Sequence, residues 1–180
     1  MIALLPKLLP DLDPTHGPLF FLEGPIDGGD DWQTEFCCEI RRHQQYFYAA
    51  VPWDCPEDHP LRSFELHDLR ESISRPVWED HYREQAVVSG CLVFWLPLES
   101  LSNPHQLSTP YAMSTRRDLE NWQQRLQHDR RLRIVIGAHP DFPGLDQIRS
   151  QFSDAMGSEF PIYHTMEEAA LAAIAKATGK

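Results

Sequence analysis

Carboxylate side chains are the groups in this sequence that could carry out acid–base or nucleophilic chemistry. Asp118 lies near the start of a predicted helix, and Glu79 and Asp80 lie in an earlier one. A carboxyl group that is partly buried beside another carboxylate has a raised pKa, so it can hold and deliver a proton. Each group also has a structural interpretation. Thr115 and Asp118 fit the Thr-x-x-Asp spacing of a capping box, and the acids of the earlier helix could form a solvated face.

A glycine-rich turn follows the first strongly apolar stretch. The run 20–22 leads through Glu23 into Gly24, Pro25 and Ile26, and further glycines and aspartates precede a helical pattern. This order predicts a strand, a turn and a helix N-terminus. In open α/β sheets, ligands bind beyond the carboxyl ends of strands, and glycine lets the backbone approach a ligand closely. The turn is therefore a candidate binding loop, although many α/β proteins begin with a strand and a glycine turn.

Aromatic side chains near the predicted strand ends could contact a flat ligand. Trp32 opens the helix after the glycine turn, where it would either stack on a base or anchor the helix. Trp53 and Asp54 follow the second predicted strand, and an aromatic group there suits the face of a purine or pyrimidine. Trp95 ends the third predicted strand and is interpreted as a core residue.

The amino-acid composition limits the kinds of molecule that the protein could bind. The chain has 180 residues, 42 % of them apolar, which is enough for one globular domain with a core. The formal net charge is −11, and no basic tract occurs. This argues against binding nucleic acid polymers or anionic membranes, whereas a nucleoside or free base remains compatible. No apolar run approaches the roughly 20 residues of a membrane span, and the apolar start lacks signal-peptide features, so we expect a cytoplasmic protein.

Metal and cofactor motifs are not found in the sequence. The four cysteines lack Cys-x-x-Cys spacing, and the nine histidines lack the His-x-x-x-His and His-Glu-x-x-His spacings of metal ligands. Neither the G-x-x-x-x-G-K-S/T nor the G-x-G-x-x-G phosphate-binding motif occurs. We therefore expect neither a metal site nor a cofactor.

Strands alternate with helices along the chain. Apolar runs predict strands over 19–22, 46–51, 91–96, 133–136 and 162–163. Apolar periodicity predicts helices over 31–42, 77–88, 115–128, 145–156 and 166–177. Thr165 and Glu168 fit a capping box for the last helix. The alternation predicts an α/β fold with a single domain: a doubly wound, mostly parallel, five-stranded sheet of flavodoxin or Rossmann type, with helices on both faces.

Two segments fall outside this alternation. Residues 1–18 contain four prolines and are expected to form an extended arm ahead of the α/β domain at 19–180. The connection 52–75 is long and irregular, with a short helix expected around 66–73. Long connections in compact domains are often binding loops.

Three blocks resemble the nucleoside 2-deoxyribosyltransferase-like family. The first is Gly24-Pro25-Ile26, where the family has an Ala-Gly-Pro turn that is followed by a tryptophan. The second is Trp78-Glu79 with the later strand end Phe94-Trp95-Leu96-Pro97. The third is Thr115-Arg116-Arg117-Asp118, where the family has Thr-x-x-Glu at a helix start. The order and approximate spacing agree over about residues 19–140.

The resemblance implies an enzyme that transfers 2-deoxyribose between nucleobases, with retention, through a covalent glycosyl-carboxylate intermediate. Asp118 matches the nucleophile of the family. Glu79 matches the acidic residue that contacts the leaving base, with Asp80 as an alternative. The resemblance also implies a cofactor-free homo-oligomer. The remaining residues expected to line the substrate pocket are Gly24, Pro25, Ile26, Trp32, Trp53, Asp54 and Thr115.

One departure from the family leaves alternatives open. Asp118 is one methylene shorter than the usual glutamate, and a misplacement near 1 Å can cost on the order of a hundredfold in rate. The same scaffold could instead hydrolyse nucleosides or nucleotides, with Arg116 and Arg117 able to contact a 5′-phosphate. A third alternative is a nucleoside- or nucleotide-binding protein without catalysis, in which Asp118 only caps its helix.

Overall fold

One sheet of six parallel strands runs through the protein. The computed structural model describes residues 1–6, 9–65, 73–106 and 108–179. The strands are β1 (Ile2–Leu4), β2 (Leu19–Glu23), β3 (Tyr48–Ala50), β4 (Cys91–Leu96), β5 (Ile134–Ala138) and β6 (Ile162–Tyr163). They pair in the order β1-β3-β2-β4-β5-β6, and every pair is parallel. The doubly wound α/β fold expected from the alternation is confirmed.

The part of the chain that the structure describes has six strands rather than the predicted five. Ile2–Leu4, in the segment that we expected to be an extended arm, pairs with Tyr48–Ala50 at one edge of the sheet. A strand of three residues shortly before Pro6 is too short for an alternating apolar pattern, so local sequence does not distinguish it from an arm. The pairing places the start of the chain within the sheet.

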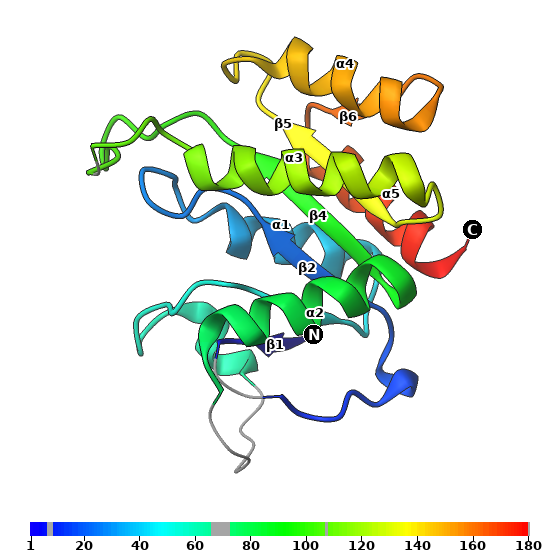
Figure 1. Ribbon diagram of the computed structural model, residues 1–180. Helices are drawn as coiled ribbons and strands as arrows, with labels where there is room; N and C mark the ends of the chain where they lie inside the picture. Colours follow the sequence, from blue (N-terminus) through cyan, green and yellow to red (C-terminus); the bar gives the residue numbers. More distant parts are fainter. Residues whose placement is uncertain (7–8, 66–72, 107, 180) are drawn as a thin grey trace.

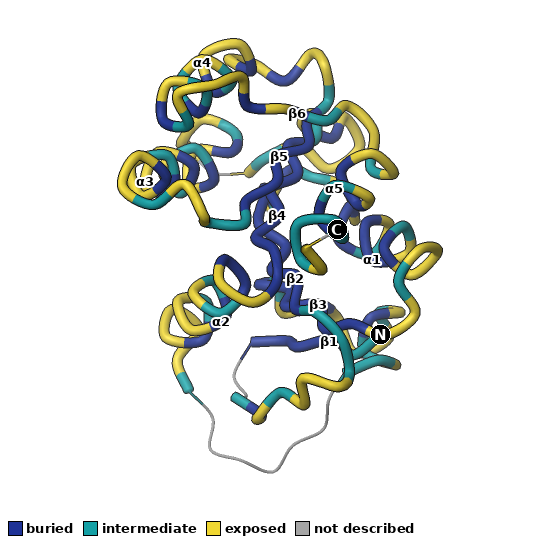
Figure 2. Tube along the Cα trace, turned by 90° about the vertical axis from the view of Figure 1, so that its right-hand side faces the viewer, coloured by how far each residue is buried: buried dark blue, intermediate teal, exposed yellow. Residues whose placement is uncertain are grey.

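Within the described residues, five α-helices cover the two faces of the sheet. They are α1 (Trp32–His43), α2 (Arg75–Ser89), α3 (Met113–His128), α4 (Leu145–Met156) and α5 (Met166–Thr178). Helices α2, α3 and α4 lie on one face, and α1 and α5 lie on the other (Figures 1 and 2). None of the helices in the described ranges is both long and apolar enough to cross a membrane.

Side chains of each strand alternate between two cores. In β2, Phe21 packs into the core under α2 and α3, whereas Phe20 and Leu22 pack into the core under α1 and α5. Because side chains of a strand alternate between faces, Glu23 projects toward the α2 and α3 side, as Phe21 does. The last residue of β2 is therefore a carboxylate on the same face as those two helices.

The topology creates a crevice at the carboxyl end of β2. The chain leaves β2 through α1 to reach β3 on one side, and then returns through α2 to β4 on the other side. Figure 1 shows the connections after β2 and β4 projecting from one edge of the sheet, where α2 and α3 also begin. Such a reversal of direction is where open α/β sheets bind ligands.

Two helix starts test the capping predictions. In α5, Thr165 accepts from the backbone of Glu168 and the Glu168 side chain accepts from the Thr165 backbone, so that predicted capping box is confirmed. In α3, the helix begins at Met113 with Ala112 as N-cap, and no side chain caps it. The capping box considered as an alternative for Thr115 and Asp118 is therefore wrong. The short helix expected around 66–73 lies outside the described residues except for Ile73.

Candidate active site

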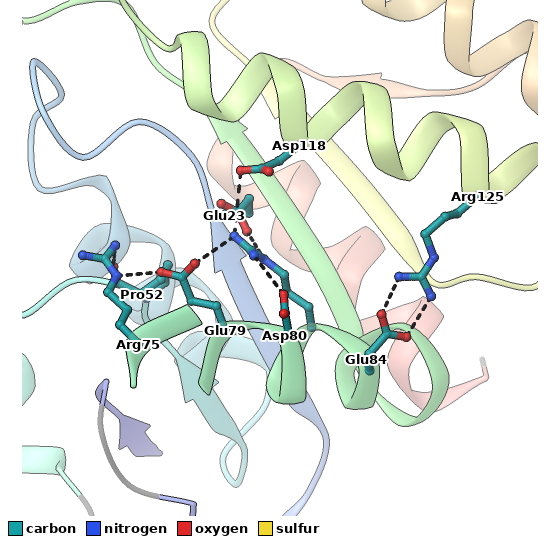
Figure 3. Close-up of polar contacts among 9 residues, drawn as sticks. Glu23, Pro52, Arg75, Glu79, Asp80, Glu84, Asp118 and Arg125 are labelled. Atoms are coloured by element: carbon teal, nitrogen blue, oxygen red, sulfur yellow. Dashed lines mark hydrogen bonds and ion pairs between the residues drawn. The ribbon is translucent and has the colours of Figure 1, made fainter. Parts of the chain in front are cut away.

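One arginine holds a cluster of carboxyl groups together at the crevice. The Arg83 Nε donates to the Glu23 Oε2 at 2.7 Å, and its Nη2 lies 3.3 Å from the Glu79 Oε2. The same Nη2 lies 3.8 Å from the Asp118 Oδ2, and Nη1 lies 3.8 Å from the Asp80 Oδ1. Figure 3 shows the four carboxyl groups converging from β2, α2 and α3. Three separate elements thus contribute charge to one centre.

Glu23 is the most deeply buried acid of the cluster, with 5 % of the residue exposed. Burial raises the pKa of Glu23 to about 7, although the guanidinium of Arg83 opposes the rise. The charges of Asp118 and Glu79 add to the increase. A carboxyl group with this pKa can hold a proton near neutral pH and release it, as a general acid or base requires.

Asp118 lies on the second turn of α3 and faces Arg83. Its side chain is 24 % exposed, so it is accessible from solvent while remaining within the cluster. Burial raises the pKa of Asp118, and Glu79 and Asp80 add to this, whereas Arg83 and Arg117 lower it. Because α3 begins at Met113, the interpretation of Asp118 as a helix cap is excluded. Its carboxylate is therefore free of a capping role.

Glu79 and Asp80 are neighbours in sequence but differ in environment. Glu79 lies between two guanidinium groups, because Arg75 Nε donates to its Oε1 at 2.6 Å while Arg83 contacts its Oε2. Arg75 also donates to the carbonyl of Pro52, which ties the end of β3 to the cluster (Figure 3). The Asp80 side chain is 80 % exposed and lies at the rim. The solvated face considered for these acids therefore describes Asp80 but not Glu79.

A cavity of about 580 Å³ lies between the glycine turn and the start of α3. Pro25 and Ile26 form part of its wall, as expected for the turn after β2. Ser114 also lines it and lies four residues before Asp118, so the two side chains share one face of α3. The cavity is in the range that binds small ligands. The other lining residues are Asp27, His105, Thr109, Pro110, Ala112, Met113, Arg116, Arg117 and Glu120.

Trp32 anchors the glycine turn. Its indole Nε1 donates to the carbonyl of Pro25 at 2.8 Å, and the side chain is buried. A Cβ added at Gly24 would lie 2.7 Å from Trp32 Cζ2 and 2.4 Å from the Trp95 carbonyl oxygen. Gly24 is thus needed for close packing against protein atoms rather than for approach to a ligand. Of the two roles considered for Trp32, the contacts favour the anchor.

Trp53 and Asp54 make their contacts away from the cavity beside α3. The Trp53 ring packs edge-on against His59, with centroids 4.7 Å apart, and is partly buried against the core under α1. Asp54 accepts from Arg62 Nη2 at 2.9 Å. Neither residue lines the cavity beside α3. Thr115 is buried in the first turn of α3 and does not line this cavity either.

A second cavity, of about 860 Å³, lies near the start of α5. Trp32, Trp95 and Met166 contribute to its walls, together with several acidic side chains. None of the carboxylates around Arg83 lines it. None of them lines the cavity beside α3 either, but that cavity reaches α3, the helix that carries Asp118, through Ser114 and Arg117.

Sequence reasoning missed Glu23 and Arg83 as site residues. Two signals were present: a glutamate ends an otherwise apolar buried strand, and Arg83 follows Glu79 with helical i, i+4 spacing. Their contact joins residues 60 positions apart, so only the folded chain reveals it.

Comparison with known proteins adds no family assignment. No protein-family model matches the chain, and a search of curated proteins found no match. Within the described ranges, no three histidine, cysteine or acidic residues are grouped so that they could hold a metal ion. The chemistry available at this site is that of carboxyl groups held by guanidinium groups beside a cavity.

Proposed function

We propose that the protein cleaves the N-glycosidic bond of 2-deoxyribonucleosides and transfers the sugar to a second nucleobase. One observation carries the proposal: Asp118 and the buried Glu23 meet at Arg83, and the helix that carries Asp118 also contributes Ser114 and Arg117 to the wall of a cavity of about 580 Å³. Retaining glycoside chemistry needs a carboxylate nucleophile and a second group that holds a proton. The resemblance of the three sequence blocks agrees with this chemistry.

In the proposed reaction, an oxygen of Asp118 attacks the anomeric carbon and the bond to the base nitrogen breaks. A proton from Glu23 compensates the charge that develops on the leaving base, because the pKa of Glu23 is raised to about 7. The acceptor base then attacks the same carbon, and the bond to Asp118 breaks. The nitrogen proton of the acceptor returns to Glu23, so the enzyme is regenerated. Two inversions give net retention.

Arg83 and Glu79 position the reacting groups in this proposal. Arg83 contacts both Glu23 and Asp118, and its guanidinium lies 5.3 Å from the centre of the Phe21 ring. Glu79 contacts Arg83 and Arg75 together. We therefore assign proton transfer to Glu23 rather than to Glu79, and assign Glu79 to holding Arg83.

Hydrolysis of the same bond is the second candidate function. The Asp118 side chain is 24 % exposed, so water can approach the side of the sugar that the acceptor base would use. Water would then replace the acceptor base and release free 2-deoxyribose.

The test is turnover by Asp118→Asn, with Asp80→Asn as its matched control. The protein is mixed with a 2′-deoxynucleoside and a different free base, and products are separated by chromatography. We expect a new deoxynucleoside from the wild type, a loss of at least about a thousandfold in Asp118→Asn, and little change in Asp80→Asn. Free sugar and free base without a new nucleoside would indicate hydrolysis. Equal turnover by both variants would contradict the role of Asp118, and no turnover by the wild type would contradict both functions.

A further inference from the structure

The segment after β4, residues 97–106, is fastened to the glycine turn after β2. The Ser100 amide donates to the Gly28 carbonyl at 2.7 Å, and Nδ1 of His105 lies 2.8 Å from Oδ2 of Asp27. Gly28 has a left-handed φ of +77°, and a Cβ added there would lie 2.8 Å from the Cβ of His105. The glycine therefore lets His105 close directly over the turn.

His105 is enclosed where the two loops meet. Its side chain is 10 % exposed, and its ring packs edge-on against Tyr111. The Tyr111 hydroxyl donates to the carbonyl of Pro97 at 3.2 Å, which ties the base of the segment to the start of α3. Asp27, His105 and Thr109 also line the cavity beside α3. The junction of the two loops is therefore part of the cavity wall.

Both ring nitrogens of His105 face hydrogen-bond acceptors. Nε2 lies 3.0 Å from the carbonyl oxygen of Thr109, which can only accept, so Nε2 carries a proton. Nδ1 is buried from water and faces the Asp27 carboxylate at 2.8 Å, and a nitrogen and an oxygen so close need a proton between them. A neutral imidazole has only one N–H group. The closed junction therefore holds a second proton, as an imidazolium–carboxylate pair does.

Charged groups from three elements surround this pair. Glu99 accepts from the His105 backbone amide at 2.9 Å, so a second carboxylate lies beside the histidine. Burial raises the pKa of the Tyr111 hydroxyl, and Glu99 and Asp30 add to the rise, so this hydroxyl keeps its proton at neutral pH. Asp27 and Glu99 compensate the charge of an imidazolium, and Tyr111 does not titrate in the range where a histidine does. Three charged side chains of α3 line the same cavity, namely Arg116, Arg117 and Glu120.

We propose that His105 is a positioning residue: its protonated form holds the segment 97–106 against the glycine turn through Asp27 and thereby fixes one wall of the nucleoside cavity. The link to nucleoside binding rests on the proposed function, whereas the Asp27–His105 pair itself does not. When the pair releases its proton to solvent, the Nδ1 lone pair faces a carboxylate and the contact becomes repulsive. Closure is therefore favoured at acidic pH and weakens as the pH rises.

Hydrogen exchange of the Ser100 amide in the full chain tests the inference, because that amide donates across the junction to Gly28. The exchange rate is divided by that of an unprotected amide at the same pH. We expect Ser100 protection in the wild type to fall at least about tenfold between about pH 5.5 and 8.5. The Leu92 amide, which donates to the Arg133 carbonyl within the sheet, reports global unfolding. The titration of Glu23 appears at Leu92 and is thereby told apart from opening of the segment.

Two variants distinguish a proton-dependent contact from a merely structural one. In Asp27→Asn, the amide group can either donate to Nδ1 or accept from it, so Ser100 protection should persist but no longer depend on pH. His105→Gln should likewise lose the pH dependence. His139→Gln is the matched control and should keep it, because His139 follows β5, has Asp141 as its partner and does not line the cavity beside α3.

Two outcomes would overturn the role of His105: wild-type protection that is equal at the two pH values, and a pH dependence that survives in both Asp27→Asn and His105→Gln. Nucleoside binding is read separately, with 2′-deoxyadenosine and thymidine as probes. A nucleoside that binds the closed form should restore Ser100 protection at pH 8.5. If neither probe does so, the Asp27–His105 pair stands and the proposed function is contradicted. Restored protection in a wild type without pH dependence would have the opposite meaning.

Discussion

The Nε of Arg83 lies 2.7 Å from Oε2 of Glu23, and both side chains are largely buried beneath α3. The pair joins the end of β2 to the middle of α2. It places a fixed positive charge between two acids whose pKa values are both raised by burial. The following predictions test how this pair contributes to stability and how the adjoining turn is held.

Removing Arg83 should destabilise the fold by more than the loss of an exposed ion pair. Arg83→Met leaves Glu23 buried without its partner, so we expect the free energy of unfolding to fall by about 3–5 kcal/mol near pH 8. Adding Glu23→Gln should restore part of the loss. The matched control is Arg125→Met, whose exposed pair with Glu84 is expected to contribute less than about 1 kcal/mol. Urea denaturation measures all three variants, and equal losses for the two arginines would contradict the prediction.

Stability should depend on pH through Glu23. Its pKa is raised by burial from 4.5 to about 7, so between these values the folded chain holds a proton that the unfolded chain has released. The stabilisation is complete below pH 4.5 and is lost as pH rises through 7. Relative to Glu23→Gln, the wild type should lose about 3 kcal/mol between pH 4.5 and 8. Denaturant titrations at several pH values measure the difference, and parallel curves for the two proteins would disprove it. Asp118 contributes with the same sign.

The turn after β2 should not tolerate a side chain at its first residue. In Gly24→Ala, the new Cβ would lie 2.4 Å from the Trp95 carbonyl oxygen, so the turn must shift. We expect a loss of about 3 kcal/mol in unfolding free energy and weaker nucleoside binding, because Pro25 forms a wall of the cavity. Gly179→Ala is the control. Its Cβ meets nothing within 4 Å, and its left-handed φ limits the loss to about 1 kcal/mol. Similar losses for both variants would contradict the packing role of Gly24.

Local sequence patterns predicted the alternation of strands and helices and two of the carboxylates that meet at Arg83. Apolar runs and helical periodicity are local, so they predicted the five α-helices of the described residues, the buried strand at 91–96 and the capping box at Thr165. The glycine turn was recognised for the same reason. Asp118 and Glu79 were identified through their sequence blocks, and the structure places both at Arg83.

Which charged side chains meet follows from the folded chain and not from local sequence. The β1 strand depends on pairing with β3, 46 positions away, and the start of α3 depends on a backbone turn at Ala112 that no side chain signals. The Glu23–Arg83 contact joins β2 to α2. Local sequence patterns do not indicate which distant residues lie close together in the fold. The pKa of Glu23 follows from burial, which is a property of the assembled core. Trp53 and Asp54 likewise have their contacts away from the cavity beside α3, because packing against His59 and Arg62 decides where they lie.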